Sequence, residues 1–290
     1  IALGFIRRKK KEISSGGYIT CIYFHDPPER LFRKCVDWLL KNGFTVITSA
    51  DLLEILGKKK TAPPLPVWIS LDDGWIGNVK NVVPYAAAKN IPLTFFISTE
   101  PAETSGIYWW SAAEEYRHQL PPPFNEDLNK LWKVPEKTRA EIINNLRKNA
   151  KVQNSPLNRE AMAVDDVKKI SGNGLFTIGS HTVNHVITPN CTDEELEYEF
   201  RESKLKLEKW TGKEINMFCF PNGDHSGREA AILKKNGYLA ACVQEDKFIT
   251  GSVNLFEIPR FCVGEGYFPE ELCHMLGIWQ NIMKKLKLKE

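Results

Sequence analysis

The chain has 290 residues, of which 42% are hydrophobic and 26% are charged, and its formal net charge is +3. This composition is typical of a globular protein, and the length suits one large barrel or two ordinary domains. So small a net charge gives no indication of nucleic-acid binding. No stretch approaches the roughly 20 apolar residues of a transmembrane helix, so the sequence predicts no membrane span.

Strand patterns alternate with helix patterns along the chain. Apolar runs bounded by turn residues predict strands at residues 18–24, 44–47, 67–72, 93–97, 175–178, 217–220, 239–243 and 255–258. Helical spacing and cap residues predict helices at residues 31–41, 50–56 (capped by Ser49), 78–89, 192–210, 228–236 and 269–287. This many βα units predict an α/β fold built as a parallel barrel.

Residues 98–163 break this alternation. They contain three adjacent aromatic residues, three consecutive prolines and helical patterns near residues 111–118 and 135–150. We interpret them as a helical insertion over one end of a single domain that spans residues 18–290. Residues 1–17 form a separate basic segment, in which the apolar part precedes the basic part, the reverse of the order in a signal peptide.

The seven cysteines form no CxxC pair, and several lie inside apolar runs. Free, buried thiols in a reducing compartment are the simplest account of this pattern. We therefore expect a cytoplasmic protein, or one held at the inner face of a membrane, with the cell envelope or secretion as the alternative. We also expect the chain to act as a monomer.

Polar residues directly follow several of the predicted strands. These residues are His25, Asp72, Asp73, His181, Asn222 and Arg260. The carboxyl ends of the strands of a parallel barrel all lie on one face. Side chains that are far apart in the sequence are therefore expected to converge there, which is a stronger argument for a site than any single motif.

The residue types indicate a metal site. His181 and His185 are four positions apart, so their imidazoles would lie on one face if this segment were helical. Two imidazoles and one carboxylate, with open positions for water, describe a hydrolytic metal site. Only one of Asp72 and Asp73 is needed as a ligand, and the other could act as the general base. The simpler alternative is a strand that ends in an Asp-Asp-Gly turn.

Three segments resemble motifs of a known family. The sequences SLDDGW (70–75), SHTVNH (180–185) and FPNG (220–223) resemble the TFDDG, H-S/T-x-x-H and RxPYG motifs of NodB-type polysaccharide deacetylases, carbohydrate esterase family 4. Their order and wide spacing also match. The resemblance covers most of residues 18–263 and implies a distorted (β/α)7 barrel that removes N-acetyl, and sometimes O-acetyl, groups from sugars.

The resemblance also implies roles for individual residues. By position, Asp72 would be the general base, and Asp73, His181 and His185 would bind a divalent metal. We expect zinc, with cobalt, nickel, manganese or iron as alternatives. Asn222 falls where a backbone N–H of the family helps to hold the oxyanion. The implied partner is an acetylated glycan substrate.

Two residues of the family pattern are missing from this sequence, and other residues would have to take their roles. Cys219 stands where the arginine of RxPYG should be, and Arg260 could replace that arginine beside the base. The late Leu-x-His motif is not visible, and His274, inside a predicted helix, fits it poorly. However, YFHD at residues 23–26 resembles the opening of the biofilm poly-N-acetylglucosamine deacetylases, whose elements are permuted and whose early histidine takes the place of the acid. His25 is therefore the candidate general acid.

Each of these assignments has a structural alternative. His25 could be a turn histidine before two prolines, and Arg260 could form an ordinary salt bridge. Trp75 and Trp110 could stack on sugar rings or fill the core. At the level of the whole chain, the alternatives are an amidohydrolase that acts on a non-sugar substrate and an inactive carbohydrate-binding domain, for which the missing arginine is a weak argument.

Overall fold

A computed structural model describes residues 18–104, 106–149 and 159–264 of the chain. The strands are β1 (Tyr18–Phe24), β2 (Thr45–Ile47), β3 (Pro66–Leu71), β4 (Leu93–Ile97), β5 (Phe176–Ser180), β6 (Met217–Cys219), β7 (Ala240–Cys242), β8 (Ile249–Thr250) and β9 (Phe261–Cys262). The α-helices are α2 (Glu29–Lys41), α3 (Ser49–Leu56), α4 (Gly77–Asn81), α5 (Val83–Ala88), α6 (Thr99–Glu103), α7 (Trp109–Glu115), α8 (Glu136–Asn149), α9 (Val164–Ser171), α10 (Asp193–Thr211) and α11 (Glu229–Lys235). Short 3-10 helices are η2 (Arg117–Gln119), η3 (Leu128–Trp132), η5 (Thr188–Asn190) and η6 (Pro221–Gly223).

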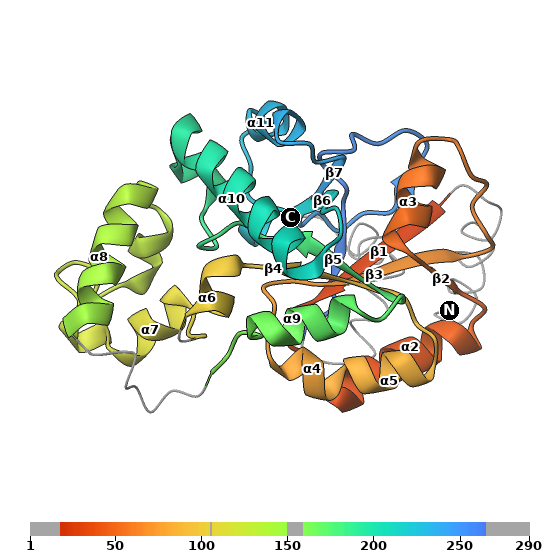
Figure 1. Ribbon diagram of the computed structural model, residues 1–290, viewed down its shortest axis with the longest axis horizontal. Helices are drawn as coiled ribbons and strands as arrows, with labels where there is room; N and C mark the ends of the chain where they lie inside the picture. The colour runs from red at the N-terminus through yellow and green to blue at the C-terminus, as the bar shows by residue number, and fades with distance from the viewer. Residues whose placement is uncertain (1–17, 105, 150–158, 265–290) are drawn as a thin grey trace, which may run out of the picture.

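The strands form one curled sheet in the order β7-β6-β5-β4-β3-β1-β8, with β2 paired to β3 and β9 paired to β1 (Figure 1). All of these pairs are parallel except the antiparallel pair of β1 and β8. Helices cover the outside of the sheet (Figure 1). The predicted α/β barrel is confirmed, and the carboxyl ends of the parallel strands share one face.

The segment from Leu255 onward connects the last strand of the sheet to the first. The Ala241 N–H donates to the Leu255 carbonyl (2.8 Å), and the Val243 N–H donates to the Ile258 carbonyl (2.9 Å). A few residues later β9 pairs with β1. The strand predicted at residues 255–258 is therefore reduced to a single bridge at Ile258, because Pro259 has no N–H with which to extend it.

Side chains alternate between the inside of the barrel and the helical layer, as a period of two requires. Ile22, Ile69 and Phe95 pack outward in the large core beneath the helices. The inward cluster contains Trp68 and Phe96 together with small residues, three of which are Cys21, Cys219 and Cys242. All six cysteines in the described residues are free thiols, and Cys273 lies outside them. The small thiols leave room in the barrel for one larger buried side chain.

Several helix boundaries differ from the sequence prediction. The helix predicted at residues 78–89 is divided into α4 and α5, because Pro84 removes a backbone donor near the start of α5. Thr48 rather than Ser49 caps α3, through a capping box with Asp51. Helix α9 was not predicted, because its apolar face is limited to a few residues of an eight-residue helix.

Between β4 and β5, helices α6, α7 and α8 lie at one side of the barrel, whereas α9 packs against the sheet (Figure 1). Helices α7 and α8 and the η3 turn enclose a separate hydrophobic cluster that includes Trp109, Leu131 and Ile143. The η3 turn is attached to the barrel by Asn190, whose amide donates to the Trp132 carbonyl (2.8 Å). This segment therefore forms a wall beside the strand ends.

The described residues leave some expectations without a structural counterpart. The basic segment 1–17 and the helix predicted at residues 269–287, with His274, lie outside them. Among the described residues, every helix is too short or too polar to cross a bilayer.

Candidate active site and metal centre

The strand ends bring together the polar residues that the sequence singled out. Asp72 and Asp73 follow β3, His181 follows β5, and Arg260 precedes β9. His185 reaches the same point from the loop after β5. All five side chains are buried, with at most 5% of each residue exposed to solvent. Burying so many ionisable groups is costly unless they pair with one another or bind an ion.

Asp73, His181 and His185 present a set of donor atoms that fits a divalent metal ion. The Asp73 Oδ1 atom lies 3.1 Å from Nε2 of His181 and 3.3 Å from Nε2 of His185. The three ligand atoms all lie within 4.8 Å of one another. One carboxylate and two imidazole nitrogens that converge on a point are the ligand set of hydrolytic zinc sites.

Neighbouring groups orient Asp73 and His181. The His181 Nδ1–H donates to the Cys219 carbonyl (2.7 Å), which leaves Nε2 as the atom with a free lone pair. The Trp75 indole N–H donates to Asp73 Oδ2 (2.8 Å), so that Oδ1 faces the histidines. The Tyr108 hydroxyl donates to the Asp73 carbonyl (3.2 Å). The ligand atoms of Asp73 and His181 are therefore held in place by contacts from the protein itself, whereas Nδ1 of His185 has no hydrogen-bond partner among the described residues.

The backbone around the candidate ligands is turned rather than helical, so His181 and His185 do not share a helix face. Thr182 and His185 have positive φ angles of 68° and 52°. Asp73 (φ 70°) and Gly74 (φ 90°) make a similar turn after β3, where a Cβ on Gly74 would lie 3.0 Å from Ile97. Such conformations cost energy in residues other than glycine and persist only where the surroundings fix them.

Glu199 of α10 and Arg139 of α8 fix the loop that carries His185. The buried Glu199 carboxylate accepts the backbone N–H groups of Val183 (2.7 Å) and Asn184 (3.0 Å) and the Asn184 side-chain amide (2.7 Å). Arg139 packs over the Trp109 ring at 4.3 Å, and its Nη2 donates to the His185 carbonyl (3.5 Å). Sequence reasoning missed both residues, because each lies on an amphipathic helix where charged residues are ordinary.

The charges at the candidate metal ligands are coupled. Burial opposes ionisation of Asp73, but hydrogen bonds to His181 and His185 outweigh it and hold the pKa of this carboxyl well below its usual value. Burial likewise opposes a charge on His181, yet its contacts with Cys219 and Asp73 raise its pKa. For His185 burial prevails and lowers the pKa. Asp73 is therefore an anion beside two imidazoles whose pKa values are shifted in opposite directions.

Asp72 forms a second buried group with Arg260. Two parallel hydrogen bonds connect the guanidinium to the carboxylate, Nη1 to Oδ1 at 2.7 Å and Nη2 to Oδ2 at 2.8 Å. Nη1 also donates to the Ser70 hydroxyl (2.9 Å), and the guanidinium lies 4.4 Å from the centre of the Tyr23 ring. A bidentate arginine–carboxylate pair fixes both position and charge.

The Asp72–Arg260 pair occupies the space that the small residues inside the barrel leave. Cys219 lies beside it, with Sγ 2.9 Å from Nη2 of Arg260 and 3.4 Å from Asp72 Oδ2. Burial opposes ionisation of Asp72, but the charge and hydrogen bonds of Arg260 outweigh it and lower the pKa of the carboxyl. An arginine thus contacts the candidate base although the expected motif position holds a cysteine.

His25 lies at the rim of this site. It is half-buried, its ring makes an edge contact with Tyr23 (5.4 Å between ring centres), and the Asn78 amide donates to its carbonyl (3.0 Å). The parallel pairing of Phe24 with Leu71 puts His25 beside Asp72 at the strand ends.

Asn222 lies in the turn after β6 with a positive φ of 57°. Within the described part of the chain its backbone N–H has no hydrogen-bond acceptor, whereas the next N–H, of Gly223, donates to the Phe220 carbonyl (2.8 Å). A Cβ on Gly223 would lie 2.5 Å from the Gln244 nitrogen, so this turn requires glycine. The Asn222 N–H is thus available to a ligand.

The two tryptophans predicted to contact sugar lie beside the candidate metal ligands. Trp75 and Trp110 are both partly exposed, and their ring centres are 6.4 Å apart. Trp110 makes an edge contact with the His185 ring (4.6 Å) and stacks on Tyr108 (4.5 Å). Trp75 has the additional contact with Asp73 already described, a role that the sequence did not indicate.

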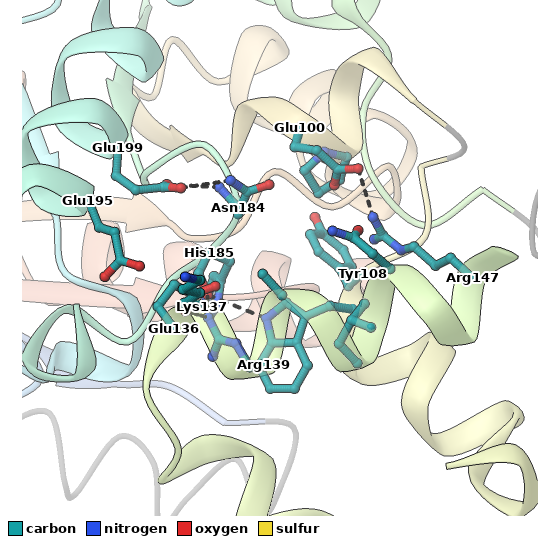
Figure 2. Close-up of a pocket in the computed structure, with 15 residues that line it drawn as sticks. Glu100, Tyr108, Glu136, Lys137, Arg139, Arg147, Asn184, His185, Glu195 and Glu199 are labelled. Carbon is teal, nitrogen blue, oxygen red and sulfur yellow. Dashed lines mark hydrogen bonds and ion pairs between the residues drawn. The ribbon is translucent and has the colours of Figure 1, made fainter. Parts of the chain in front are cut away.

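A separate cavity of about 210 Å³ lies behind His185, between α8 and α10 (Figure 2). His185 is the only candidate ligand among the described residues that line it, so the reaction cannot be placed there. Figure 2 shows Glu136 and Arg139 of α8 facing Glu195 and Glu199 of α10. Burial and repulsion from these two glutamates outweigh the attraction of Arg139 and raise the pKa of Glu136 to about 7.

We expect Glu136→Gln to remove a pH dependence of stability. The native state holds the Glu136 proton more tightly than the unfolded chain does, because the pKa of Glu136 is raised on folding. The protonated group therefore adds to the free energy of unfolding. This contribution is complete below about pH 4.5 and is lost as the pH rises to about 7. The free energy of unfolding of the wild type should therefore fall, relative to the variant, by up to about 3 kcal/mol across this range. Urea titrations of both proteins at several pH values measure this difference, and Glu141→Gln on the exposed face of α8 is the control. Parallel curves for Glu136→Gln and the wild type would contradict the assignment.

Comparisons with known proteins agree with this geometry. A sequence model described as "Polysaccharide deacetylase" matches residues 59–241, more than half of the chain. The match includes the two aspartates, both histidines and Asn222, but neither His25 nor Arg260. A poly-beta-1,6-N-acetyl-D-glucosamine N-deacetylase of Staphylococcus aureus is 22% identical over 257 residues, which are 88% of this chain and 72% of that protein.

Two solved structures share the fold. The Streptococcus pyogenes deacetylase PplD, in complex with acetate, aligns with a TM-score of 0.65 at 14% identity, covering 89% of this chain and 98% of its own. IcaB from Ammonifex degensii aligns with a TM-score of 0.64, also at 14% identity, covering 90% of this chain and 98% of its own. At this level of identity the two structures support the barrel and its strand order, not the roles of individual residues.

Proposed function

This chain belongs to the polysaccharide deacetylase family, and from this membership we propose the substrate and the residue roles of its active site. The chain is a hydrolase that removes acetyl groups from N-acetylated sugar polymers. The substrate we propose is a β-linked poly-N-acetylglucosamine, because the curated relative that aligns with most of the chain is named for that polymer. The buried Asp72–Arg260 pair next to Asp73, His181 and His185 is the observation that supports activity, since it removes the one argument for an inactive site.

In the proposed reaction Asp73, His181 and His185 would hold one zinc ion. When bound there, zinc would supply Lewis acidity toward the acetyl carbonyl and lower the pKa of water. Asp72, kept ionised by Arg260, takes the proton of the water that attacks the carbonyl carbon. The Asn222 N–H donates to the oxygen that becomes negative. His25 gives a proton to the sugar nitrogen as the carbon–nitrogen bond breaks, because an amine anion is too poor a leaving group.

Acetate release from a panel of acetylated glycans tests this function. The panel should contain oligomers of β-1,6- and β-1,4-linked N-acetylglucosamine, an O-acetylated sugar and a small non-sugar amide. The proposal requires acetate from the N-acetylglucosamine oligomers and the fastest release from the β-1,6-linked ones. Release from the non-sugar amide alone would show that the same site serves another substrate.

Removal of the metal should abolish the activity reversibly. We expect the purified protein to hold about one zinc ion per chain, and a chelator followed by zinc should remove and restore acetate release. His181→Ala deletes one of three protein ligands, so its zinc affinity should fall by at least about 100-fold, more than the loss of an outer contact such as that of Trp75 would cause. Metal analysis and competition with a chromogenic chelator measure both quantities.

A matched control for this experiment is His118→Ala, because His118 is an exposed histidine of the helical segment between β4 and β5. It should bind zinc as the wild type does. Equal zinc affinity in His181→Ala and the wild type would refute the proposed ligand set.

We also propose that the chain works in a reducing compartment. The six free cysteines of the described residues support this proposal, because oxidising compartments favour disulfides. Thiol counting on the natural protein, isolated under conditions that trap free thiols, tests the proposal, and paired cysteines would refute it.

A further inference from the structure

Three tryptophans form a row that leads away from the metal ligands. Trp75, whose indole contacts Asp73, lies 6.4 Å from Trp110 between ring centres, and Trp110 lies 6.2 Å from Trp132. All three are partly exposed although tryptophan is usually well buried. We call these residues the aromatic strip. Exposed rings that follow one another in space, starting at a reacting centre, can contact a ligand that extends beyond that centre.

The outer part of the strip borders a groove of about 510 Å³ between α7 and η3. The groove is lined by Trp109, Trp110, Ser111, Ala113, Glu114, Glu115, Leu128, Asn129, Leu131 and Trp132. Its volume and its mixture of aromatic walls with a few polar groups are those of a small-ligand site. Trp110 lines the groove and also contacts the His185 ring, so the groove lies next to the candidate metal ligands.

The charged side chains that line the groove are all acidic among the described residues. Glu114 and Glu115 are exposed, and none of the described residues that line the groove is basic. Within the described part of the chain neither carboxylate forms an ion pair, so both are available to a ligand. Two free carboxylates next to tryptophan faces attract a cation, through charge and through the electrons of the rings.

We propose that this groove binds an N-deacetylated, ammonium-bearing sugar residue next to the residue that is being deacetylated. The proposal rests on the deacetylase function above and specifies its substrate. The pyranose ring stacks on Trp110 and Trp132, and the ammonium group, which a previous turnover leaves on the sugar, faces Glu114 and Glu115. An acetylated neighbour would lose the charge interaction, since its amide is neutral. The enzyme therefore prefers partly deacetylated chains over fully acetylated ones.

Kinetics on two matched substrates test the preference. One is a fully acetylated N-acetylglucosamine oligomer, and the other has the same length with one internal amine, assayed at about pH 6 where such amines are protonated. We expect a KM at least about 5-fold lower for the oligomer with the amine, which is the effect of about 1 kcal/mol from an exposed cation–π or ion pair. Raised salt should reduce the preference.

Substitutions in the groove test whether the preference for the amine-bearing oligomer arises there. The double substitution Glu114→Gln and Glu115→Gln should raise KM for the amine-bearing oligomer about 5-fold and for the acetylated one less than 2-fold, with kcat little changed. Trp132→Ala should raise KM for both oligomers, and Trp132→Phe should restore much of the loss. The control Glu141→Gln removes an exposed negative charge from the same helical segment and should change neither constant.

Calorimetry with a fully deacetylated glucosamine oligomer gives a readout that does not depend on turnover. Binding that weakens in the double glutamine variant supports the subsite even if the assayed acetyl group proves to be the wrong substrate. Normal acetate release with the same KM for both oligomers and in all variants would overturn the subsite while leaving the deacetylase function intact. Equal losses for both oligomers in the glutamine variant would also overturn it, because the groove would then hold an acetylated residue.

Discussion

Replacing Asp72 with asparagine should reduce acetate release by about 10⁴-fold, the upper end of the range for loss of a general base. The substitution keeps the volume of the side chain and one oxygen that can accept from Arg260, but it removes the group that takes the proton of water. Zinc binding should survive, because the ligand set is made by Asp73, His181 and His185. Turnover measured beside zinc content in the same preparation separates the loss of a base from the loss of the metal.

The structure suggests two checks on this result. Asp72 and Arg260 are a buried pair, so the variant leaves a guanidinium without its anion, and circular dichroism must show that the barrel is still folded. Asp165→Asn, on the exposed face of α9, is the matched control and should leave the rate unchanged. A folded, zinc-loaded Asp72→Asn protein that kept even a tenth of the wild-type rate would show that another group is the base.

The sequence was sufficient to predict the barrel and the place of the site. Apolar runs that end in polar residues identified β1, β3, β5 and β6, and parallel strands put those ends on one face. Asp72, Asp73 and His181 could be predicted for this reason, since each directly follows a strand. The loop of His185 could not, because its turned backbone depends on Glu199, which comes from a helix formed later in the chain.

Contacts between distant elements explain most of what the sequence left open. Arg260 is 188 positions from Asp72, and no spacing rule predicts that its guanidinium reaches that carboxylate through the inside of the barrel. The sequence evidence for this pair was indirect. The cysteine at position 219 left Asp72, the candidate base, without the arginine that the family motif places beside it. Arg260 was a cation at the end of another predicted strand. The roles of Trp75 and Tyr108 on Asp73 were not predictable, because aromatic residues near a site serve as core as often as they donate hydrogen bonds.

The position of β1 outside the family match bears on the assignment of the general acid. The family match begins at residue 59, so it does not include β1, and His25 reaches the site only because β1 pairs with β3 in register from Thr20 to Phe24. That pairing puts the residue after Phe24 next to the one after Leu71, which is Asp72. The strand pairing, rather than a motif, therefore supports a role for His25 in the reaction.

Replacing His25 with alanine should slow deacetylation of an N-acetyl sugar by roughly 10²–10⁴-fold, the usual effect of removing a general acid. The loss should be much smaller for an O-acetyl ester of the same sugar, because an alkoxide leaves more easily than an amine anion. Zinc content should not change, since His25 is not among the candidate ligands. The ratio of the two losses, measured as kcat on the amide and on the ester, is the diagnostic quantity.

This ratio distinguishes an acid from a histidine that only shapes the turn before Pro27. A structural defect would slow both substrates alike, because it would displace Asp72 and Asp73 for either reaction. Added imidazole should restore part of the amide rate in His25→Ala, since it can carry a proton into the space that the side chain leaves. His118→Ala, a substitution of an exposed histidine, should behave as the wild type on both substrates. If His25→Ala keeps the full rate on the amide, the proton comes from another group and the early histidine is structural.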